Sequence, residues 1–330
     1  MSTLLFGSRR CSFLLKFFFS IFQFFFFRMT GAEIGDTVGE YSLVRALGKG
    51  TYGCVYEGVH ELSGEKKALK KIKFSIKYEN IYLVFREISI LKFLNHKNII
   101  PLDDVFVPPP SGESSDCIYL ITPLCDSDLR WWVRKNYTDR KVPVKIVCDL
   151  ISQIGSAIQY LHSNKIMHRD LKPQNILMSK NRILKIADFG LSKIYRKNKI
   201  TMTHEIVTLW YRPPEVILGA PQYDESIDMW SIGVIMAELL GGVNPFNGRN
   251  EVETLMKIFQ LIGTPKYMGV EKLVNFSLKF PKWPQTDSLL RWENRLPPCG
   301  VLAELIHMLV RTDPKERINA SKFMALLDIN

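Results

Sequence analysis

The sequence predicts an α+β protein that is rich in strands near its start and mainly helical afterwards. Three observations lead to this fold class. From residue 41 to about residue 72, apolar residues alternate around a glycine-rich turn, as in paired strands. Residues 84–94 and 146–161 carry apolar side chains at spacings of three and four, as amphipathic helices do. Residues 227–240 are apolar nearly all round, which is typical of a buried helix.

Length, composition and charge set the limits of this prediction. The 330 residues are enough for one large two-lobed domain or two medium domains. With 46% hydrophobic and 23% charged residues, the chain as a whole is not disordered. The 6 cysteines form no Cys-x-x-Cys pair, so they imply neither a zinc site nor a disulfide framework. The net charge of +11 favours acidic or phosphorylated partners, but no aromatic-basic motif points to nucleic acid.

Residues 1–30 form an apolar, Phe-rich extension that differs from the rest of the chain. From Phe13 to Phe27 the sequence is almost wholly apolar, but this stretch is shorter than the roughly 20 residues of a spanning helix. No Ala-x-Ala-like cleavage site follows it, as one would in a signal peptide. Three interpretations stay open: a true start at Met29, a membrane or targeting segment, or a folded appendage. We expect the globular protein to begin near Tyr41.

Residues 41–72 are expected to form three strands. The Gly-x-Gly-x-x-Gly motif at 48–53 is weak evidence alone, because a Rossmann fold carries the same motif before a helix. Here the residues from Val55 onward continue as a second strand, and Ser63-Gly64 turns the chain into a third. The glycines therefore lie at the tip of a hairpin. Without Cβ atoms, that tip can lie close to phosphate groups and offer backbone N–H donors.

Charged motifs follow this hairpin in a fixed order. Lys70 ends the third strand in an apolar frame, and Glu87 lies in the helical pattern that follows. Residues 168–175 read His-Arg-Asp-Leu-Lys-Pro-Gln-Asn, and residues 188–190 read Asp-Phe-Gly. Taken singly, the lysine and glutamate can be solvated, and each aspartate can be a turn residue. Together with the glycine loop, these motifs match the protein-kinase set in the right order.

From about residue 41 to 325 the chain therefore resembles eukaryotic protein kinases, and among them the cyclin-dependent kinases. The closer resemblance rests on Gly-Thr-Tyr-Gly at 50–53, on residues 203–212, and on two short motifs at 247–248 and 263–265. Mitogen-activated kinases would carry Thr-x-Tyr where this chain has Thr-Met-Thr. The resemblance implies a two-lobed kinase fold. Its small β-rich N-lobe with one helix, and the hinge, would span 41–125, and its mainly helical C-lobe 126–330.

The resemblance implies phosphoryl transfer from ATP, with Mg²⁺, to Ser or Thr hydroxyls of proteins. Asp170 would orient the substrate hydroxyl, and Lys172 would steady the γ-phosphate. Lys70, held by Glu87, would grip the α- and β-phosphates. The Mg²⁺ ligands would be Asn175 and Asp188. The residues expected around ATP are Leu47, Gly48, Gly50, Thr51, Tyr52, Gly53, Val55, Ala68, Lys70, Cys125 and Asp128.

The resemblance also places the adenine and the ribose. Residues 118–121 would form the strand before the hinge, with Thr122 as the small gatekeeper residue. Because Pro123 lacks an N–H group, donation to the adenine would come from Cys125. Asp128 would reach the ribose. The alternative is a plain edge strand.

Regulatory residues are implied in two places. Thr203 would be the activating phosphosite, with Thr201 as the rival acceptor. The cations expected to clamp its phosphate are Arg86, Arg169 and Lys193. Family members usually carry arginine at the position of Lys193, so this clamp would be weaker. Phosphates on Thr51 and Tyr52 would be inhibitory, unless these residues only shape the hairpin.

The resemblance also implies residues that select the substrate and residues that support the site. The residues expected to shape the substrate pocket are Val207, Thr208 and Arg212. This pocket would favour proline after the target Ser or Thr, because proline leaves no N–H unsatisfied there. In the family, the aspartate matching Asp228 braces the catalytic loop, and Glu215 pairs with the arginine matching Arg317. Pro213 stands where the family usually has alanine.

Several alternatives stay open for the activating partner and for the class of protein. Residues 81–87 depart from the family signature Pro-Ser-Thr-Ala-Ile-Arg-Glu on the helix that faces the cyclin, so a cyclin and another activator both stay open. A mitogen-activated-type kinase without cyclin dependence is one alternative. A pseudokinase or scaffold is another, but such a protein would be expected to have lost Lys70, Asp170 or Asp188. We expect a cytoplasmic or nuclear protein that contacts membranes only if residues 13–27 are retained.

Overall fold

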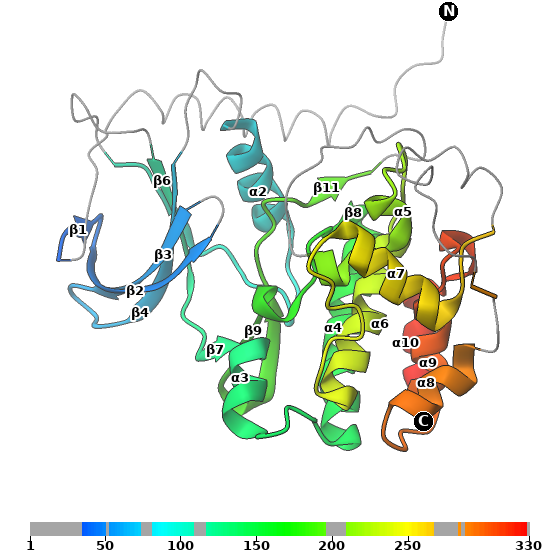
Figure 1. The fold of residues 1–330 in the computed structure, drawn as a ribbon. Helices are drawn as coiled ribbons and strands as arrows, with labels where there is room; N and C mark the ends of the chain where they lie inside the picture. The colour runs from blue at the N-terminus through cyan, green and yellow to red at the C-terminus, as the bar shows by residue number, and fades with distance from the viewer. Residues whose placement is uncertain are drawn as a thin grey trace, which may run out of the picture. The chain divides into compact units, whose positions relative to one another are not determined.

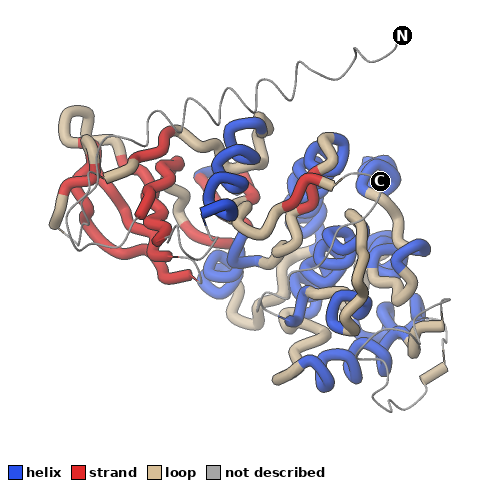
Figure 2. Tube along the Cα trace, turned by 90° about the horizontal axis from the view of Figure 1, so that it is seen from above, coloured by secondary structure: helices blue, strands red, loops and turns tan. Residues whose placement is uncertain are grey.

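The computed structural model of the protein describes residues 35–50, 53–73, 81–108, 117–195, 209–266, 283–284 and 288–328. The chain divides into two compact units. The first unit comprises the described residues up to Ile88 together with Leu102–Leu124, and the second comprises Ser89–Pro101 and the residues from Cys125 onward (Figure 1). Strands gather in the first unit, whereas helices make up most of the second (Figure 2). The expected α+β class is confirmed.

The first unit is built on one antiparallel sheet with the strand order β1-β2-β3-β4-β6-β5. Its strands are β1 (Thr37–Val38), β2 (Tyr41–Gly50), β3 (Gly53–His60), β4 (Lys66–Lys73), β5 (Asp104–Phe106) and β6 (Cys117–Pro123). Strands β2 and β3 form the expected hairpin, in which Gly48 faces Val55 and Gly50 faces Gly53. Apolar side chains from β1, β2, β4 and β6 bury one another in a single cluster around Leu69 and Tyr119.

Helix α2 (Ile81–Phe93) follows β4 in the chain and confirms the expected helical pattern. Val84, Ile88 and Leu91, at spacings of four and three, are all buried. This single stripe fixes which way the helix turns its polar side chains, because residues three and four apart share one face.

The second unit is mainly helical. Its helices are α3 (Leu129–Asn136), α4 (Val144–Ser163), α5 (Pro214–Ile217), α6 (Ser226–Gly241), α7 (Glu251–Ile262), α8 (Ser288–Arg295), α9 (Val301–Leu309) and α10 (Ala320–Asp328). Short strands accompany them: β7 (Ser127–Asp128), β8 (Ile166–Met167), β9 (Ile176–Ser179), β10 (Ile183–Ile186) and β11 (Lys193–Ile194). Strands β10, β9 and β7 form one small sheet, and β11 pairs with β8.

Helix α6 forms the core of the second unit. It is buried on all sides from Ile227 to Ala237, as its apolar sequence predicts, and it packs against α4 and α9. Gly242, with φ of 77°, ends the helix in the left-handed conformation and donates its N–H to the Glu238 carbonyl at 2.8 Å. Because α6 cannot shift without opening this core, it is a rigid base for the loops around it.

Within the residues that the structure describes, no helix is long and apolar enough to cross a membrane. Residues 13–27, on which the expected membrane contact depends, lie outside the described residues.

Candidate active site

The glycine-rich hairpin carries two glycines that the fold treats differently. A Cβ atom on Gly53 would lie 1.8 Å from the carbonyl oxygen of Lys71, so the pairing of β3 with β4 itself requires glycine there. Among the residues that the structure describes, a Cβ atom on Gly48 would meet nothing within 4 Å. Packing therefore does not explain Gly48, which leaves ligand approach as a reason for it. Leu47 and Val55 flank this position on β2 and β3. Thr51 and Tyr52 lie outside the described residues.

Lys70 and Glu87 form an ion pair inside the first unit. Strand β4 presents Lys70, and α2 presents the buried Glu87, with Nζ and Oε1 2.7 Å apart. The Lys70 side chain keeps 21% of its surface exposed, against 6% for Glu87. The pair thus fixes the ammonium group and leaves part of it open to a further anion.

The residues expected around the adenine and the ribose lie on β4, on β6 and shortly after β6. Thr122 pairs with Ala68 across β6 and β4, and β6 ends at Pro123. Cys125 is half-buried, and burial raises the pKa of its thiol to about 11. Asp128 is the N-cap of α3, where Oδ1 accepts the N–H of Trp131 at 2.8 Å. That hydrogen bond fixes the orientation of the carboxylate expected to reach a ribose.

Two residues of the loop between β8 and β9 converge on one carboxylate oxygen of a third, Asp170. Lys172 Nζ lies 2.7 Å from Asp170 Oδ2, and Asn175 Nδ2 donates to the same oxygen at 2.8 Å. Asn175 Nδ2 also donates to the Asp170 carbonyl at 2.8 Å. Within the described chain, Oδ1 of Asp170 accepts no hydrogen bond. Burial raises the pKa of Asp170, Lys172 opposes this rise, and the nearby charge of Asp188 adds to it.

Asp188 follows a strand that leads out of the small sheet of the second unit. Its φ of 64° is in the left-handed region, which is unusual for a residue other than glycine. The next residue, Phe189, is fully buried with its ring edge-on to His168, 5.0 Å between centroids. The buried phenyl ring therefore anchors the backbone that carries Asp188 beside the catalytic-loop residues.

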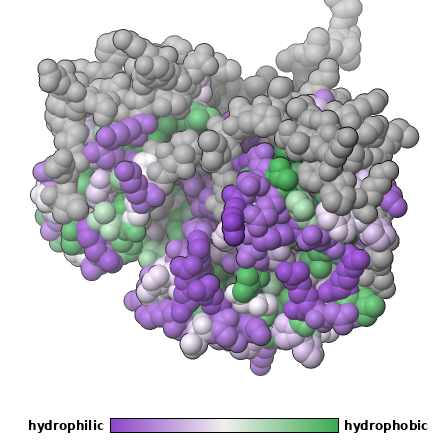
Figure 3. Space-filling view, in the orientation of Figure 1, coloured by the Kyte–Doolittle hydropathy of each residue, from purple (hydrophilic) through white to green (hydrophobic). Residues whose placement is uncertain are grey.

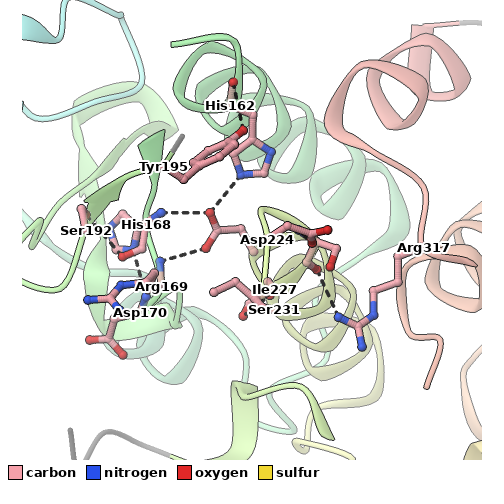
Figure 4. A network of polar contacts seen from close by, with 12 residues as sticks. His162, His168, Arg169, Asp170, Ser192, Tyr195, Asp224, Ile227, Ser231 and Arg317 are labelled. Carbon is pink, nitrogen blue, oxygen red and sulfur yellow. Dashed lines mark hydrogen bonds and ion pairs between the residues drawn. The ribbon is translucent and has the colours of Figure 1, made fainter. Parts of the chain in front are cut away.

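Asp228 on α6 holds the backbone just before Asp170; Figure 4 shows this network around His162, His168 and Arg169. Its two oxygens accept the N–H groups of His168 and Arg169, each at 2.9 Å, and His162 Nε2 lies 2.9 Å from Oδ2. Burial alone would raise the pKa of Asp228, but the hydrogen bond and charge of His162 and the backbone donors outweigh it, so the pKa is lowered. The carboxylate therefore stays ionised in a fully buried position.

The residues expected to clamp a phosphate are only partly described. Arg169 donates hydrogen bonds from Nε to the Leu191 carbonyl at 2.5 Å and from Nη1 to the Tyr223 hydroxyl at 2.6 Å. Lys193 lies on β11, opposite Met167 of β8, and Arg86 lies on α2 of the first unit. The predicted phosphosites Thr203 and Thr201 lie outside the described residues.

The predicted substrate pocket is described only at one end. Val207 and Thr208 lie outside the described residues, and Arg212 is half-buried just after the short turn Leu209–Tyr211. Glu215 follows, and its carboxylate forms the expected pair with Arg317: Nη1–Oε1 is 2.6 Å and Nη2–Oε2 is 2.7 Å. This buried two-bond pair ties the segment after Arg212 to the end of the chain.

Sequence reasoning missed two polar contacts of this region. The helical pattern of residues 146–161 does not single out His162, although its ring contacts Asp228. Tyr211 donates its hydroxyl to Glu238 Oε2 at 2.6 Å, and Asn244 Nδ2 donates to the same oxygen at 2.9 Å. A histidine or glutamate near the end of an apolar helix is a weak signal for a buried polar contact, because the same side chains at helix ends often face solvent instead.

Comparisons with known proteins agree with this geometry. Residues 41–326 match the family described as protein kinase domain. The chain is also similar to cyclin-dependent kinase 2 of Caenorhabditis elegans, with 36% identity over 290 residues. The matched segment covers 86% of this chain and 77% of that relative.

Proposed function

Because the chain belongs to the protein kinase family and is a serine/threonine kinase similar to the cyclin-dependent kinases, we propose a role for each group of its active site. The two-lobed kinase fold predicted from the sequence is confirmed by the family match. Phosphoryl transfer needs positioned charges rather than covalent chemistry by the protein. The observation that carries the proposal is the convergence of Lys172 and Asn175 on one oxygen of Asp170.

We propose Asp170 as the residue that receives the substrate hydroxyl. Lys172 and Asn175 both hold Oδ2, which fixes the carboxylate in one orientation and leaves Oδ1 for the hydroxyl hydrogen. Asp228 fixes the backbone just before it. A carboxylate that is pre-oriented in this way saves the cost of ordering it during the reaction.

Protein kinases in general use ATP and Mg²⁺, and the residues of this chain fit both. Asp188 and Asn175 supply the hard oxygen donors that Mg²⁺ prefers. Because the amide nitrogen of Asn175 is used by Asp170, its carbonyl oxygen is the atom turned elsewhere and suited to a metal ion. When bound, the metal would neutralise charge on the transferred phosphoryl group. In the first unit, Lys70 would hold phosphate oxygens, with Glu87 fixing its ammonium group.

Further residues are proposed for nucleotide binding from the family likeness. Gly48 would allow the phosphates to approach β2, while Leu47, Val55 and Ala68 would contact the adenine. The backbone N–H of Cys125 would donate to the base, and Asp128, already oriented as a helix cap, would accept from the ribose. The ranges 41–125 and 126–330 would correspond to the two lobes.

Regulation and substrate choice are proposed from the family likeness. Phosphate on Thr203 would be held by Arg86, Arg169 and Lys193 and would activate the enzyme. Val207, Thr208 and Arg212 would favour a proline after the target residue. Phosphates on Thr51 and Tyr52 would inhibit. A cyclin or another activator would bind near Glu87 on α2.

The direct test is transfer of labelled γ-phosphate from Mg²⁺-ATP to a generic basic protein. We expect the Asp170→Asn variant to lose about 10³-fold or more of this activity while keeping the thermal midpoint of the wild type. Asp149→Asn, an exposed aspartate on α4, is the matched control and should keep full activity. Wild-type protein without transfer, even after phosphorylation of Thr203, would instead support the pseudokinase alternative.

A further inference from the structure

Three arginines of the second unit line one pocket near the candidate catalytic loop. The pocket has a volume of about 300 Å³ and is bordered by α3, the loop after it, the end of α6 and the loop that follows α6. Arg130 and Arg134 come from α3, and Arg140 comes from the loop after it. Figure 3 shows hydrophilic residues over much of the face of the second unit that it presents.

The guanidinium groups of these arginines have no protein partner in the part of the chain that the structure describes. Neither a hydrogen bond nor an ion pair is formed by Arg130, Arg134 or Arg140 through its side chain there. Arg130 is half-buried, while the other two are exposed. Three positive charges without a hydrogen-bonded protein partner around one concavity raise the local concentration of anions, and guanidinium forks match carboxylate and phosphate oxygens.

The backbone holds Arg140 in place rather than leaving it on a loose loop. Arg140 has φ of 62° and donates its N–H to the Tyr137 carbonyl at 3.0 Å. Val142 donates to the Leu239 carbonyl at 2.8 Å, which ties the loop to α6. At Gly242 a Cβ atom would lie 2.5 Å from the Asp139 carbonyl, so the end of α6 also packs closely on this loop. The backbone that carries the third arginine is thus fixed relative to the other walls.

One acidic side chain, Glu238, also lines the pocket. Its Oε2 is already engaged by Tyr211 and Asn244, and the charge of Arg130 acts on this same group of residues. With three arginines against one glutamate, the lining carries an excess of positive charge. The apolar walls from Trp210 and Val133 would support the stem of a bound side chain.

The pocket lies next to the candidate catalytic residues. Pro173, which belongs to the lining, is three residues after Asp170, so their Cα atoms are within about 11 Å of each other. An extended peptide covers that distance in about three to four residues. A substrate whose hydroxyl reaches Asp170 can therefore place a neighbouring side chain in the pocket.

We propose that this pocket is a subsite for an anionic side chain, a phosphoserine or a glutamate, within about five residues of the target Ser or Thr. The inference rests on the proposed function of Asp170 and names a substrate class for it: acidic or already phosphorylated protein segments. The volume of about 300 Å³ accommodates several water molecules and so one phosphorylated side chain.

The rate test uses Ser-Pro peptides that carry phosphoserine, glutamate, alanine or arginine at one position, scanned over about five residues on each side of the target. We expect phosphoserine to raise kcat/KM over alanine by about tenfold or more in at least one position, with glutamate intermediate. The advantage should shrink as salt increases, because the charges lie at a partly exposed site.

The variant Arg134→Gln/Arg140→Gln removes the two exposed cations and should abolish this preference while leaving the rate on the alanine peptide unchanged. Lys135→Gln is the matched control, since Lys135 lies on the same helix but is not part of the lining and instead stacks over Trp131. It should keep the preference. Thermal midpoints of all variants establish that each is folded.

A binding assay separates this inference from the proposed function. Fluorescence anisotropy with a labelled phosphopeptide whose target serine is replaced by alanine needs no catalysis, and the same loss of affinity is expected for the double variant. Equal kcat/KM for phosphoserine and alanine at every position would overturn the inference, as would a preference that the double variant retains. A preference for arginine would assign the pocket to Glu238 and overturn it too. Phosphorylation of the Ser-Pro peptide that carries alanine at the scanned position tests the proposed function alone.

Discussion

Charged side chains in the two units are held in very different ways. In the first unit, Lys70 and Glu87 form one ion pair between a strand and a helix, and 21% of the lysine surface stays exposed. In the second unit, Asp228 is fully enclosed and accepts from two backbone N–H groups and a histidine. The first arrangement leaves capacity for a ligand, whereas the second leaves none. We infer that the buried network determines the shape of the catalytic loop and that the partly exposed Lys70 serves substrate chemistry.

Removing the Asp228 carboxylate is expected to have the largest effect on stability. The Asp228→Asn variant turns an amide NH₂ toward buried donors and leaves at least one of them unsatisfied. We expect a loss of about 3 kcal/mol or more in the free energy of unfolding, together with a loss of activity. Urea unfolding followed by fluorescence measures the first. Asp224→Asn, an exposed change nearby, serves as the control. A thermal midpoint equal to that of the wild type would break the comparison.

The acid dependence of this variant follows from the sign of the pKa shift. Because the pKa of Asp228 is lowered in the folded protein, its stabilising effect is complete above the ordinary carboxyl pKa of about 4 and is lost as pH falls through the lower folded value. The stability difference between wild type and Asp228→Asn should therefore stay constant from about pH 7 to pH 5. A difference that vanishes by pH 5 would mean that the pKa is raised instead.

Substitution of the two hairpin glycines is expected to have an intermediate effect on stability. The two variants also distinguish a glycine required by packing from one required by ligand approach. Gly53→Ala places a methyl group against the Lys71 carbonyl and should cost about 1–3 kcal/mol of stability. Gly48→Ala meets open space, so it should leave the thermal midpoint within a few degrees and raise the KM for ATP. Thermal melts and ATP titrations of both variants check this. The opposite ranking of the two midpoints would contradict the account.

The smallest effect is expected for an ion pair of the first unit whose lysine is mostly exposed and whose buried Glu57 keeps a second partner, Arg45. Lys66 Nζ lies 2.9 Å from Glu57, but 61% of the lysine side chain is exposed. Lys66→Met should change the free energy of unfolding by less than about 1 kcal/mol, because solvent and salt screen the pair. Stability measured at low and high salt tests this. A larger, salt-independent loss would show that exposure is the wrong measure of how firmly a charge is held.

Much of this arrangement could be predicted from local patterns in the sequence. The alternation around 48–53 predicted the hairpin of β2 and β3, and the three- and four-residue spacing predicted α2 and α4. The pairs Lys70–Glu87 and Glu215–Arg317 followed from a resemblance that fixes residue order and hence partners. These features depend on short range or on a known motif.

Other parts of the site arise only when the chain is folded. Arg130 and Arg134 share a helix face by their spacing, but nothing local brings Arg140 or the end of α6 beside them. That juxtaposition depends on the left-handed backbone at Arg140 and on the close approach that Gly242 permits. Likewise, His162 reaches Asp228 only because α4 packs on α6. Contacts made by tertiary packing carry no periodic signal in the sequence.

The central claim, that the partly exposed Lys70 of the first unit serves chemistry more than stability, is tested most directly by comparing Lys70→Met with Lys71→Met. The two lysines are neighbours on β4, and Lys71 lies over the ring of Tyr119 at 5.7 Å instead of pairing with Glu87. In one assay series, γ-phosphate transfer and the thermal midpoint are measured for both variants. The account predicts that Lys70→Met loses about 10²-fold or more of activity at temperatures well below its midpoint, even though loss of the partner of buried Glu87 lowers that midpoint, while Lys71→Met stays active. Full activity of Lys70→Met, or a loss of activity explained by unfolding, would contradict it.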